Sequence, residues 1–192
     1  LLKLWLRAGV MVDGELQITD WGTQQGGVIS PLEANVYLDK ALDQWLTKTY
    51  FPGLKGKAVF SRYADDFVIV FQDEHECRQA LQDITTRLEE FGLTVNRSKT
   101  RITDMRPLAV GEAPKGIPPE ITFLGFTLYW KPCPDTGWEL AVRTSDKSIK
   151  RFTERLQAWL GEYGAQGCEV PTALLAAKLR GHRDYFDVAG DD

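Results

Sequence analysis

Two adjacent carboxylates, Asp65 and Asp66, lie inside residues 57–71, a segment rich in Val, Ile, Phe and Tyr. Neighbouring carboxylates at the tip of a hairpin repel each other unless a cation lies between them. A divalent cation removes that repulsion, and two-metal phosphoryl transfer uses such carboxylates to hold the ions beside a substrate triphosphate. An Asp-Asp pair is also a common polar turn, so the dipeptide alone does not identify a metal site.

Other metal-binding side chains are scarce in the sequence. The two histidines are His75 and His182, and the three cysteines have no paired spacing; they are Cys77, Cys133 and Cys168. Such cysteines argue against a disulfide framework and a zinc site, and they fit a reducing cytoplasm. We therefore expect a hard cation such as Mg²⁺, held by carboxylate oxygens.

Four segments of the sequence resemble reverse transcriptases encoded by bacterial group II introns, and they occur in the order typical of that family. They are GTQQGGVISPLEANVYL at residues 22–38, RYADDFVIVF at 62–71, GLTVNRSKT at 92–100 and FLGF at 123–126. Residues 145–152 and LRGHRDYF at 179–186 are similar to the thumb of that family. The resemblance covers nearly the whole chain. It implies an RNA-directed DNA polymerase that acts on an RNA template, a DNA primer and dNTPs, and that also binds intron RNA.

The resemblance implies catalytic roles for three side chains. Asp65 and Asp66 would bind Mg²⁺ in a two-metal site, and Lys99 would place a positive charge near the triphosphate. Tyr63 would lie under the primer end or the incoming nucleotide. Taken without the resemblance, Tyr63 is equally well a packed strand residue, and Lys99 a solvated lysine.

Three further groups of residues are implied to contact nucleic acid. A nucleotide- or template-binding loop contains Gln25, Gly26 and Gly27, whose glycines permit close backbone approach. A primer-grip strand contains Phe123, Leu124 and Gly125. The spacing of four basic residues places them on one face of a helix that could follow duplex phosphates; they are Lys147, Lys150, Arg151 and Arg155.

The sequence departs from the family pattern in two places. Gln24 stands where the family usually has proline, although Gln25, Gly26 and Gly27 are intact. No segment before residue 22 matches the upstream strand that carries the first catalytic aspartate; Asp13 and Asp20 lie in turn-like surroundings. We therefore expect the sequence to be part of a longer protein, and residues 1–192 alone to be inactive, because two-metal catalysis needs that third carboxylate.

The elements that position these residues follow from apolar periodicity and turn residues. Helices are predicted over residues 1–8, 32–50 and 74–91, the second with Leu32, Val36, Ala41, Leu42, Trp45 and Leu46 on one face and the third ended by Gly92. Strands are predicted over residues 14–19, 93–102, 121–130 and 138–143, and two buried strands flank the acidic turn. Two later helices begin after Ser145 and at Pro171; the first ends before Gly161 and the second at about residue 186.

These elements predict an α+β fold. An incomplete polymerase palm, with an antiparallel sheet and packed helices, occupies residues 1–142, and a helical thumb segment occupies residues 143–192. The formal net charge of −4 is unusual for a nucleic-acid-binding protein, but residues 143–183 carry eight basic and four acidic side chains. No apolar run is long enough to cross a membrane. We expect a cytoplasmic bacterial protein.

Other functions stay open at this point. The protein could act mainly as a maturase, an RNA-binding splicing factor that uses the polymerase fold for RNA, although the intact acidic pair argues against a decayed polymerase. A different palm enzyme, such as a nucleotide cyclase, is disfavoured by the ordered set of segments. Related reverse transcriptases of retrons or diversity-generating elements share these segments.

Overall fold

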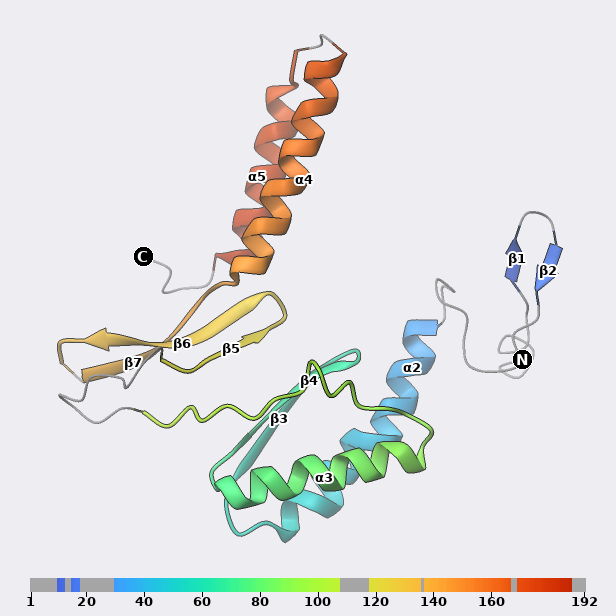
Figure 1. Ribbon diagram of the computed structural model, residues 1–192, viewed down its shortest axis with the longest axis vertical. Coiled ribbons are helices and arrows are strands. Elements are labelled where there is room, and N and C mark those ends of the chain that lie inside the picture. Colours follow the sequence, from blue (N-terminus) through green and yellow to red (C-terminus); the bar gives the residue numbers. More distant parts are fainter. Residues whose placement is uncertain are drawn as a thin grey trace. The chain divides into compact units, whose positions relative to one another are not determined.

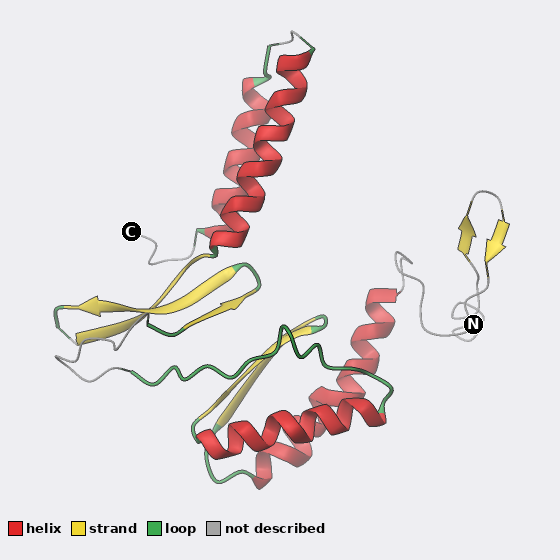
Figure 2. Cartoon of the chain, in the orientation of Figure 1, coloured by secondary structure: helices red, strands yellow, loops and turns green. Residues whose placement is uncertain are grey.

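The computed structural model describes residues 30–107, 118–135, 137–166 and 169–187, and the backbone alone of residues 10–12 and 15–17. Helices and small antiparallel sheets make up the described chain (Figures 1 and 2), so the predicted α+β class is confirmed. The chain divides into two compact units, residues 1–100 and 101–192, and each is described by itself. The palm–thumb boundary predicted near residue 143 lies within the second unit and stays a prediction.

The described part of the first unit contains two pairs of antiparallel strands and two helical segments. β1 (Val10–Val12) and β2 (Glu15–Gln17) pair antiparallel, and β2 lies within the strand predicted over residues 14–19. A continuous helical segment follows, made of α2 (Ser30–Leu38), the π-helical turns η1 (Asp39–Asp43) and η2 (Leu46–Tyr50), and the 3-10 turn η3 (Phe51–Gly53). β3 (Ala58–Tyr63) and β4 (Asp66–Phe71) form the second hairpin, and α3 (Glu74–Glu90) follows.

The core of this unit lies where η1 and η2 pack against α3. Its buried side chains are Leu42, Leu46, Ala80, Ile84 and Leu88, and Phe60, Phe67, Ile69 and Phe71 pack against them from the hairpin. The spacing of the three α3 residues by four places them on one helical face. Burial of these apolar groups is the main force that holds the hairpin on the helices.

Residues at both ends of α3 explain its bounds. The side chain of Asp73 accepts a hydrogen bond from the backbone N–H of Glu76, which caps the first turn. After the helix, Gly92 has a φ of +69°, a conformation that glycine adopts without steric cost. The predicted end of this helix at Gly92 is therefore confirmed.

Two predictions of buried faces in this unit are wrong. Leu32 and Val36 of α2 are 63% and 64% exposed, and only Ala41, Leu42 and Leu46 of the predicted apolar face are buried. In the hairpin, side chains alternate between a packed and an exposed face, and Val59 and Val70 lie on the exposed one. The reason is that, among the described elements, α3, η1 and η2 cover one side of the hairpin only.

The strand predicted over residues 93–102 is also wrong, because residues 93–96 are extended without a ladder and residues 97–99 form a turn. The Asn96 side-chain oxygen accepts hydrogen bonds from the backbone N–H and the hydroxyl of Ser98, and the backbone carbonyl of Asn96 accepts from the N–H groups of Lys99 and Thr100. These local bonds take the donors that a strand ladder needs. Leu93 and Val95 still pack on the core, which explains their alternating pattern.

The second unit combines a three-stranded sheet with a helical hairpin (Figure 1). β5 (Glu120–Phe123), β6 (Phe126–Cys133) and β7 (Gly137–Thr144) pair antiparallel in sequence order. α4 (Asp146–Ala165) and α5 (Thr172–Phe186) follow. Ser145 caps α4 as predicted, whereas the predicted end of that helix before Gly161 is wrong, since α4 continues through Gly161 to Ala165.

The single strand predicted over residues 121–130 is wrong, because a two-residue turn at Leu124 and Gly125 divides it into β5 and β6. Leu124 and Gly125 have φ values of +52° and +87°, which suit a tight hairpin turn. The FLGF segment is therefore a strand end, a turn and a strand start, rather than the interior of one strand.

Candidate functional site

The acidic pair lies at the tip of the β3–β4 hairpin, as predicted. Tyr63 pairs with Asp66 across the strands, and Ala64 and Asp65 form the two-residue turn between them. Both aspartates are exposed, and within the described ranges no hydrogen bond or ion pair joins either carboxylate to another side chain. Two like charges are thus held next to each other and in contact with solvent, an arrangement that favours binding of a cation.

The register of the hairpin determines what lies beside the acidic pair. Directly opposed residues in an antiparallel pair share one face of the sheet, so Tyr63 and Asp66 lie on the same face. Tyr63 is 68% exposed, which places an aromatic side chain in solvent next to a carboxylate. A packed position for Tyr63 is therefore excluded within the described part of the unit.

Arg62 lies one residue before Tyr63, and its side chain belongs to the opposite, packed face. Its Nε and Nη2 donate to the Asp43 carboxylate at 2.8 and 2.5 Å, and Nη1 donates to Asn35 Oδ1 at 2.8 Å. Nη1 also donates to the carbonyl of Ala64 at 2.7 Å. The hydrogen bond to Asp43 raises the pKa of Arg62. This guanidinium thus links the helical segment to the turn that holds Asp65.

The conformation of Ala64 is unusual for a residue that has a side chain. Its φ of +53° lies in the left-handed region, which steric contact of Cβ with the backbone disfavours. Asp65 is the next residue, so the direction of its side chain depends on this conformation. The side chain of Arg62, a residue of β3, holds the turn through its hydrogen bond to the Ala64 carbonyl.

The donor set of the turn fits a hard divalent cation. Carboxylate oxygens are the ligands that Mg²⁺ prefers, and Mg²⁺ in enzymes is often held by one or two carboxylates while it keeps several waters. Among the described residues, no group of three or more His, Cys, Asp or Glu side chains gathers into a metal site. Among the described residues of this turn, Asp65 and Asp66 are the two carboxylates that could bind such an ion.

The other predicted nucleotide-binding residues are not joined to the acidic pair by any contact that the structure describes. Lys99 lies in the turn after Asn96, with an exposed side chain. It belongs to the same unit as Asp65, but it lies in a turn rather than at the predicted strand end. Gln25, Gly26 and Gly27 lie outside the described residues.

The predicted primer-grip residues form the β5–β6 turn. The carbonyl of Gly125 accepts a hydrogen bond from the N–H of Ser145 at 2.8 Å, just before α4. A Cβ atom on Gly125 would lie 3.0 Å from Ser148 Oγ and 3.2 Å from a ring carbon of Phe186. Phe123 is half-buried and Leu124 is exposed at the tip of the turn. This turn therefore joins the sheet to both helices of the second unit.

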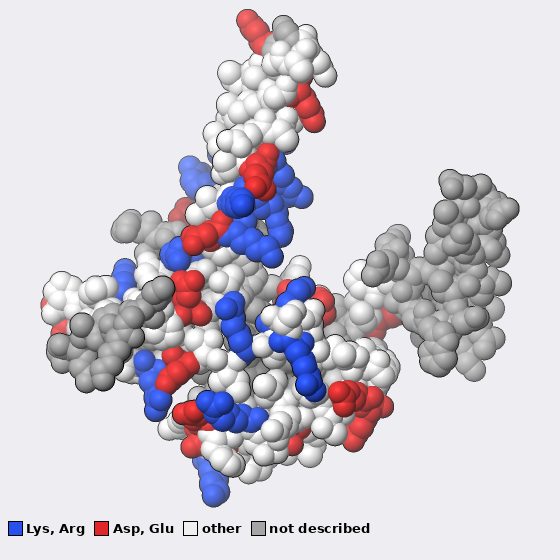
Figure 3. All heavy atoms as spheres, in the orientation of Figure 1, with Lys and Arg blue, Asp and Glu red and all other residues white. Residues whose placement is uncertain are grey.

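The four basic residues predicted on α4 are all exposed. Figure 3 shows Lys and Arg side chains gathered over the lower half of the α4–α5 hairpin, with white and red atoms above them. Lys150 lies 3.9 Å from Glu154, one turn further on, and this exposed pair leaves the charge open to solvent. The residues concerned are Lys147, Lys150, Arg151 and Arg155.

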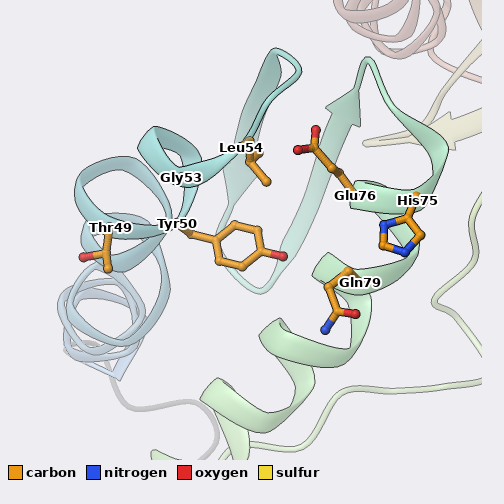
Figure 4. Close-up of a pocket in the computed structure, with 7 residues that line it drawn as sticks. All are labelled: Thr49, Tyr50, Gly53, Leu54, His75, Glu76 and Gln79. Atoms are coloured by element: carbon orange, nitrogen blue, oxygen red, sulfur yellow. The ribbon is translucent and has the colours of Figure 1, made fainter.

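A shallow pocket of about 400 Å³ lies elsewhere in the first unit (Figure 4), lined by residues of η2, η3, α3 and the η3–β3 loop. Its polar groups stabilise the fold. Glu76 accepts hydrogen bonds from the backbone N–H groups of Lys55 and Gly56, and Tyr50 donates from its hydroxyl to Asp83 at 2.8 Å. Burial, and then Asp83, raise the pKa of Tyr50.

Residue-by-residue reasoning missed the partners of Arg62. Asn35 and Arg62 both lie inside segments already singled out, ANVYL and RYADD, so their presence there is the signal that could have suggested a link. Asp43 lies outside every such segment, and only the folded chain places it beside Arg62.

The sequence was compared with models of known protein families and with curated proteins. The family model described as reverse transcriptase (RNA-dependent DNA polymerase) matches residues 1–128. A comparison with curated proteins gives no match. In the described part of the chain, no helix is both long and apolar enough to span a membrane.

Proposed function

Because this chain belongs to the reverse transcriptase (RNA-dependent DNA polymerase) family, we propose that Asp65 and Asp66 are ligands of Mg²⁺ in its polymerase centre. The observation that carries the proposal is the pair of exposed carboxylates at the β3–β4 turn, which have no cationic partner among the described residues. The family implies an RNA template, a DNA primer and dNTPs as partners. A bacterial, cytoplasmic location belongs to the same proposal.

A divalent cation bound there would supply the chemistry of two-metal enzymes, which is to lower the pKa of an attacking hydroxyl and to neutralise charge on a leaving pyrophosphate. The chain's own residues bind and orient. Asp65 and Asp66 hold the ion at the tip of a rigid hairpin, and Tyr63 offers an exposed ring on the Asp66 face for a base or sugar. Lys99 adds a positive charge for the triphosphate, and Gln25, Gly26 and Gly27 approach the nucleotide or template.

Substitution of Asp65 tests this function directly. In the active polymerase, Asp65→Ala is expected to lower primer extension on an RNA template by at least about a thousandfold, because metal stabilisation contributes several kcal/mol and each 1.4 kcal/mol is tenfold. Asp135→Ala is the matched control, since Asp135 is an exposed carboxylate between β6 and β7. Substantial extension by a folded Asp65→Ala protein would show that the acidic pair is not the catalytic site.

We further propose that the protein derives from a group II intron and binds the intron RNA. The ordered GTQQGG, YADD, GLTVN and FLGF segments support this origin. The exposed basic side chains on α4 supply a surface for an RNA backbone; they are Lys147, Lys150, Arg151 and Arg155.

The same basic surface favours a maturase role as a second candidate function. RNA binding by α4 does not need the metal site, so the two roles can be separated. If the protein is a maturase, its Asp65→Ala variant is expected to support splicing of the cognate intron. If it acts only as a polymerase, neither the wild type nor the Asp65→Ala variant is expected to support splicing.

A further inference from the structure

The guanidinium of Arg62 is held in one orientation by three separate acceptors. Four of its five N–H donors are used, two by Asp43, one by Asn35 and one by the Ala64 carbonyl. The Arg62 side chain is only 10% exposed, so water competes little for these donors. A planar group fixed by helical residues on one side thus presents a fixed donor to the turn on the other.

Asp43 neutralises the positive charge of Arg62. An arginine near two unpaired carboxylates would ordinarily pair with one of them and so repel a metal ion. Here Asp43 binds both Nε and Nη2, which neutralises the guanidinium on the packed face of the hairpin. Arg62 can therefore hold the backbone of the turn while the carboxylates of Asp65 and Asp66 stay available.

We propose that Arg62 is a positioning residue: its hydrogen bond to the Ala64 carbonyl keeps that residue at positive φ and so fixes the Asp65 carboxylate for a divalent cation. This inference rests on the proposed role of Asp65 and Asp66 in binding Mg²⁺. Asn35 and Asp43 act on the turn indirectly, because their hydrogen bonds orient Arg62. The segments that contain Asn35 and Arg62 are thereby joined by a single side chain.

Arg62→Lys separates this role from simple charge pairing. Lysine keeps the positive charge for Asp43, but its three donors radiate from one nitrogen and cannot reproduce the planar fork. Arg78→Lys is the matched control, because Arg78 makes an exposed ion pair with Glu74 on α3, away from the turn. Asn35→Ala is a milder second variant that leaves the ion pair between Arg62 and Asp43 intact.

Two NMR readouts on the full 192-residue chain test the proposal. The first, without metal, is the pair of ¹³Cα and ¹³Cβ shifts of Ala64, which report its φ. The second is a titration with Mg²⁺ alone, followed at the amides of Asp65 and Asp66. The signals of α3 in the same spectra show whether each variant is folded.

Arg62→Lys is expected to move the Ala64 shifts toward those of an ordinary extended residue and to raise the Mg²⁺ midpoint about tenfold, equivalent to about 1.4 kcal/mol. Asn35→Ala is expected to raise the midpoint about threefold, as the loss of one neutral hydrogen bond would. Arg78→Lys is expected to change neither readout. Unchanged Ala64 shifts in a folded Arg62→Lys chain would overturn the inference, and so would an unchanged midpoint.

Failure of the proposed metal site has a different signature. If Asp65→Asn leaves the Mg²⁺ response of the amides unchanged, the acidic pair is not the metal site. The Ala64 shifts of the Arg62→Lys chain still decide, in that case, whether Arg62 holds the turn.

Discussion

Carboxylates in the first unit differ in whether they have partners among the described residues. Asp43, Asp73, Glu76 and Asp83 each accept hydrogen bonds from a guanidinium, a backbone N–H or a hydroxyl, and they fix local structure. Asp65 and Asp66 have no such partner among the described residues, and they lie at a turn whose backbone is held by the Arg62 side chain. Asp65 and Asp66 are thus open to solvent and to a ligand, whereas the four carboxylates named first are engaged in the fold.

The hydrogen bond between Tyr50 and Asp83 gives a pH-dependent prediction at this scale. Burial, and then Asp83, raise the pKa of Tyr50 above its ordinary value of about 10, so the folded chain favours the neutral phenol. This stabilisation is fully present below pH 10 and is lost as the pH rises toward the raised pKa. Tyr50→Phe is expected to lower the free energy of unfolding at pH 7 by about 1 kcal/mol.

Urea unfolding of the wild type and of Tyr50→Phe, measured at several pH values, checks this expectation. The difference between wild type and Tyr50→Phe should narrow as the pH rises above 10, because ionisation in the unfolded state then favours unfolding of the wild type only. Tyr163→Phe is the control, since Tyr163 contacts Trp159 through its ring and makes no hydrogen bond to a described residue. A difference that stays constant from pH 7 to pH 11 would contradict the assigned cause.

At the scale of the element, both hairpins that carry predicted site residues turn at two-residue loops with positive φ, one at Ala64 and one at Leu124 and Gly125. The second is also a joint, because Gly125 contacts α4 through Ser145 and approaches Phe186 at the end of α5. Phe126, directly after the turn, packs with its ring centroid 5.2 Å from that of Phe186. The packing of the sheet against α4 and α5 in this unit therefore depends on Gly125 having no side chain.

Substitution of that glycine separates backbone strain from packing. Gly125→Ala is expected to cost about 1–2 kcal/mol for the left-handed φ and about 1–3 kcal/mol more for the contact of its Cβ with Ser148 and Phe186. Gly92→Ala is the matched control: its φ is also positive, but no atom lies within 4 Å of the added Cβ. Hydrogen exchange at the amides of α5 measures the packing cost, which only Gly125→Ala should show.

A further variant tests the contact itself. Phe186→Leu removes the ring carbons nearest to Gly125, so it is expected to reduce the additional cost of Gly125→Ala when the two changes are combined. If Gly125→Ala and Gly92→Ala change the hydrogen-exchange rates of the α5 amides equally, the β5–β6 turn does not connect the sheet to α5.

The elements also show which features sequence could predict. The β3–β4 turn was predictable because two aspartates interrupt apolar strands, and polar residues at a turn are easy to recognise. The β5–β6 turn was missed because Leu124 is apolar and Gly125 can also occur inside a strand. The strand over residues 93–102 was wrong because Asn96 forms a local turn. For the site, the acidic pair was predictable, whereas the contact between Arg62 and Asp43 depends on how distant segments pack.

At the scale of the whole molecule, the net charge of −4 and the local charge of α4 point to different behaviour toward nucleic acid. An acidic protein is repelled by phosphates on average, so binding must come from a local surface. Exposed basic side chains on α4 provide one, and their charges are not taken up by buried carboxylates. Affinity for a duplex should therefore depend on a few residues and strongly on salt.

Salt dependence makes this quantitative. Replacing Lys150 and Arg151 with alanine is expected to reduce the slope of log affinity against log salt by about 0.9 for each phosphate that the protein no longer neutralises, the value for B-DNA. Lys48→Ala combined with Arg78→Ala removes the same charge from exposed positions in the first unit and is expected to leave the slope unchanged. Fluorescence anisotropy with an RNA–DNA hybrid duplex measures both slopes, and equal slopes would contradict a specific role for α4.

The contacts of Arg62 have a consequence for the order in which the chain folds during its synthesis. Asn35 and Asp43 precede Arg62 by 27 and 19 residues, and Ala64 follows it by two. A ribosome releases the chain from its N-terminus, and folding can begin before synthesis ends. The three residues whose side chains hold the Ala64 carbonyl, Asn35, Asp43 and Arg62, have therefore all been made before Asp65 is added, so their contacts need nothing that follows β4 in the chain.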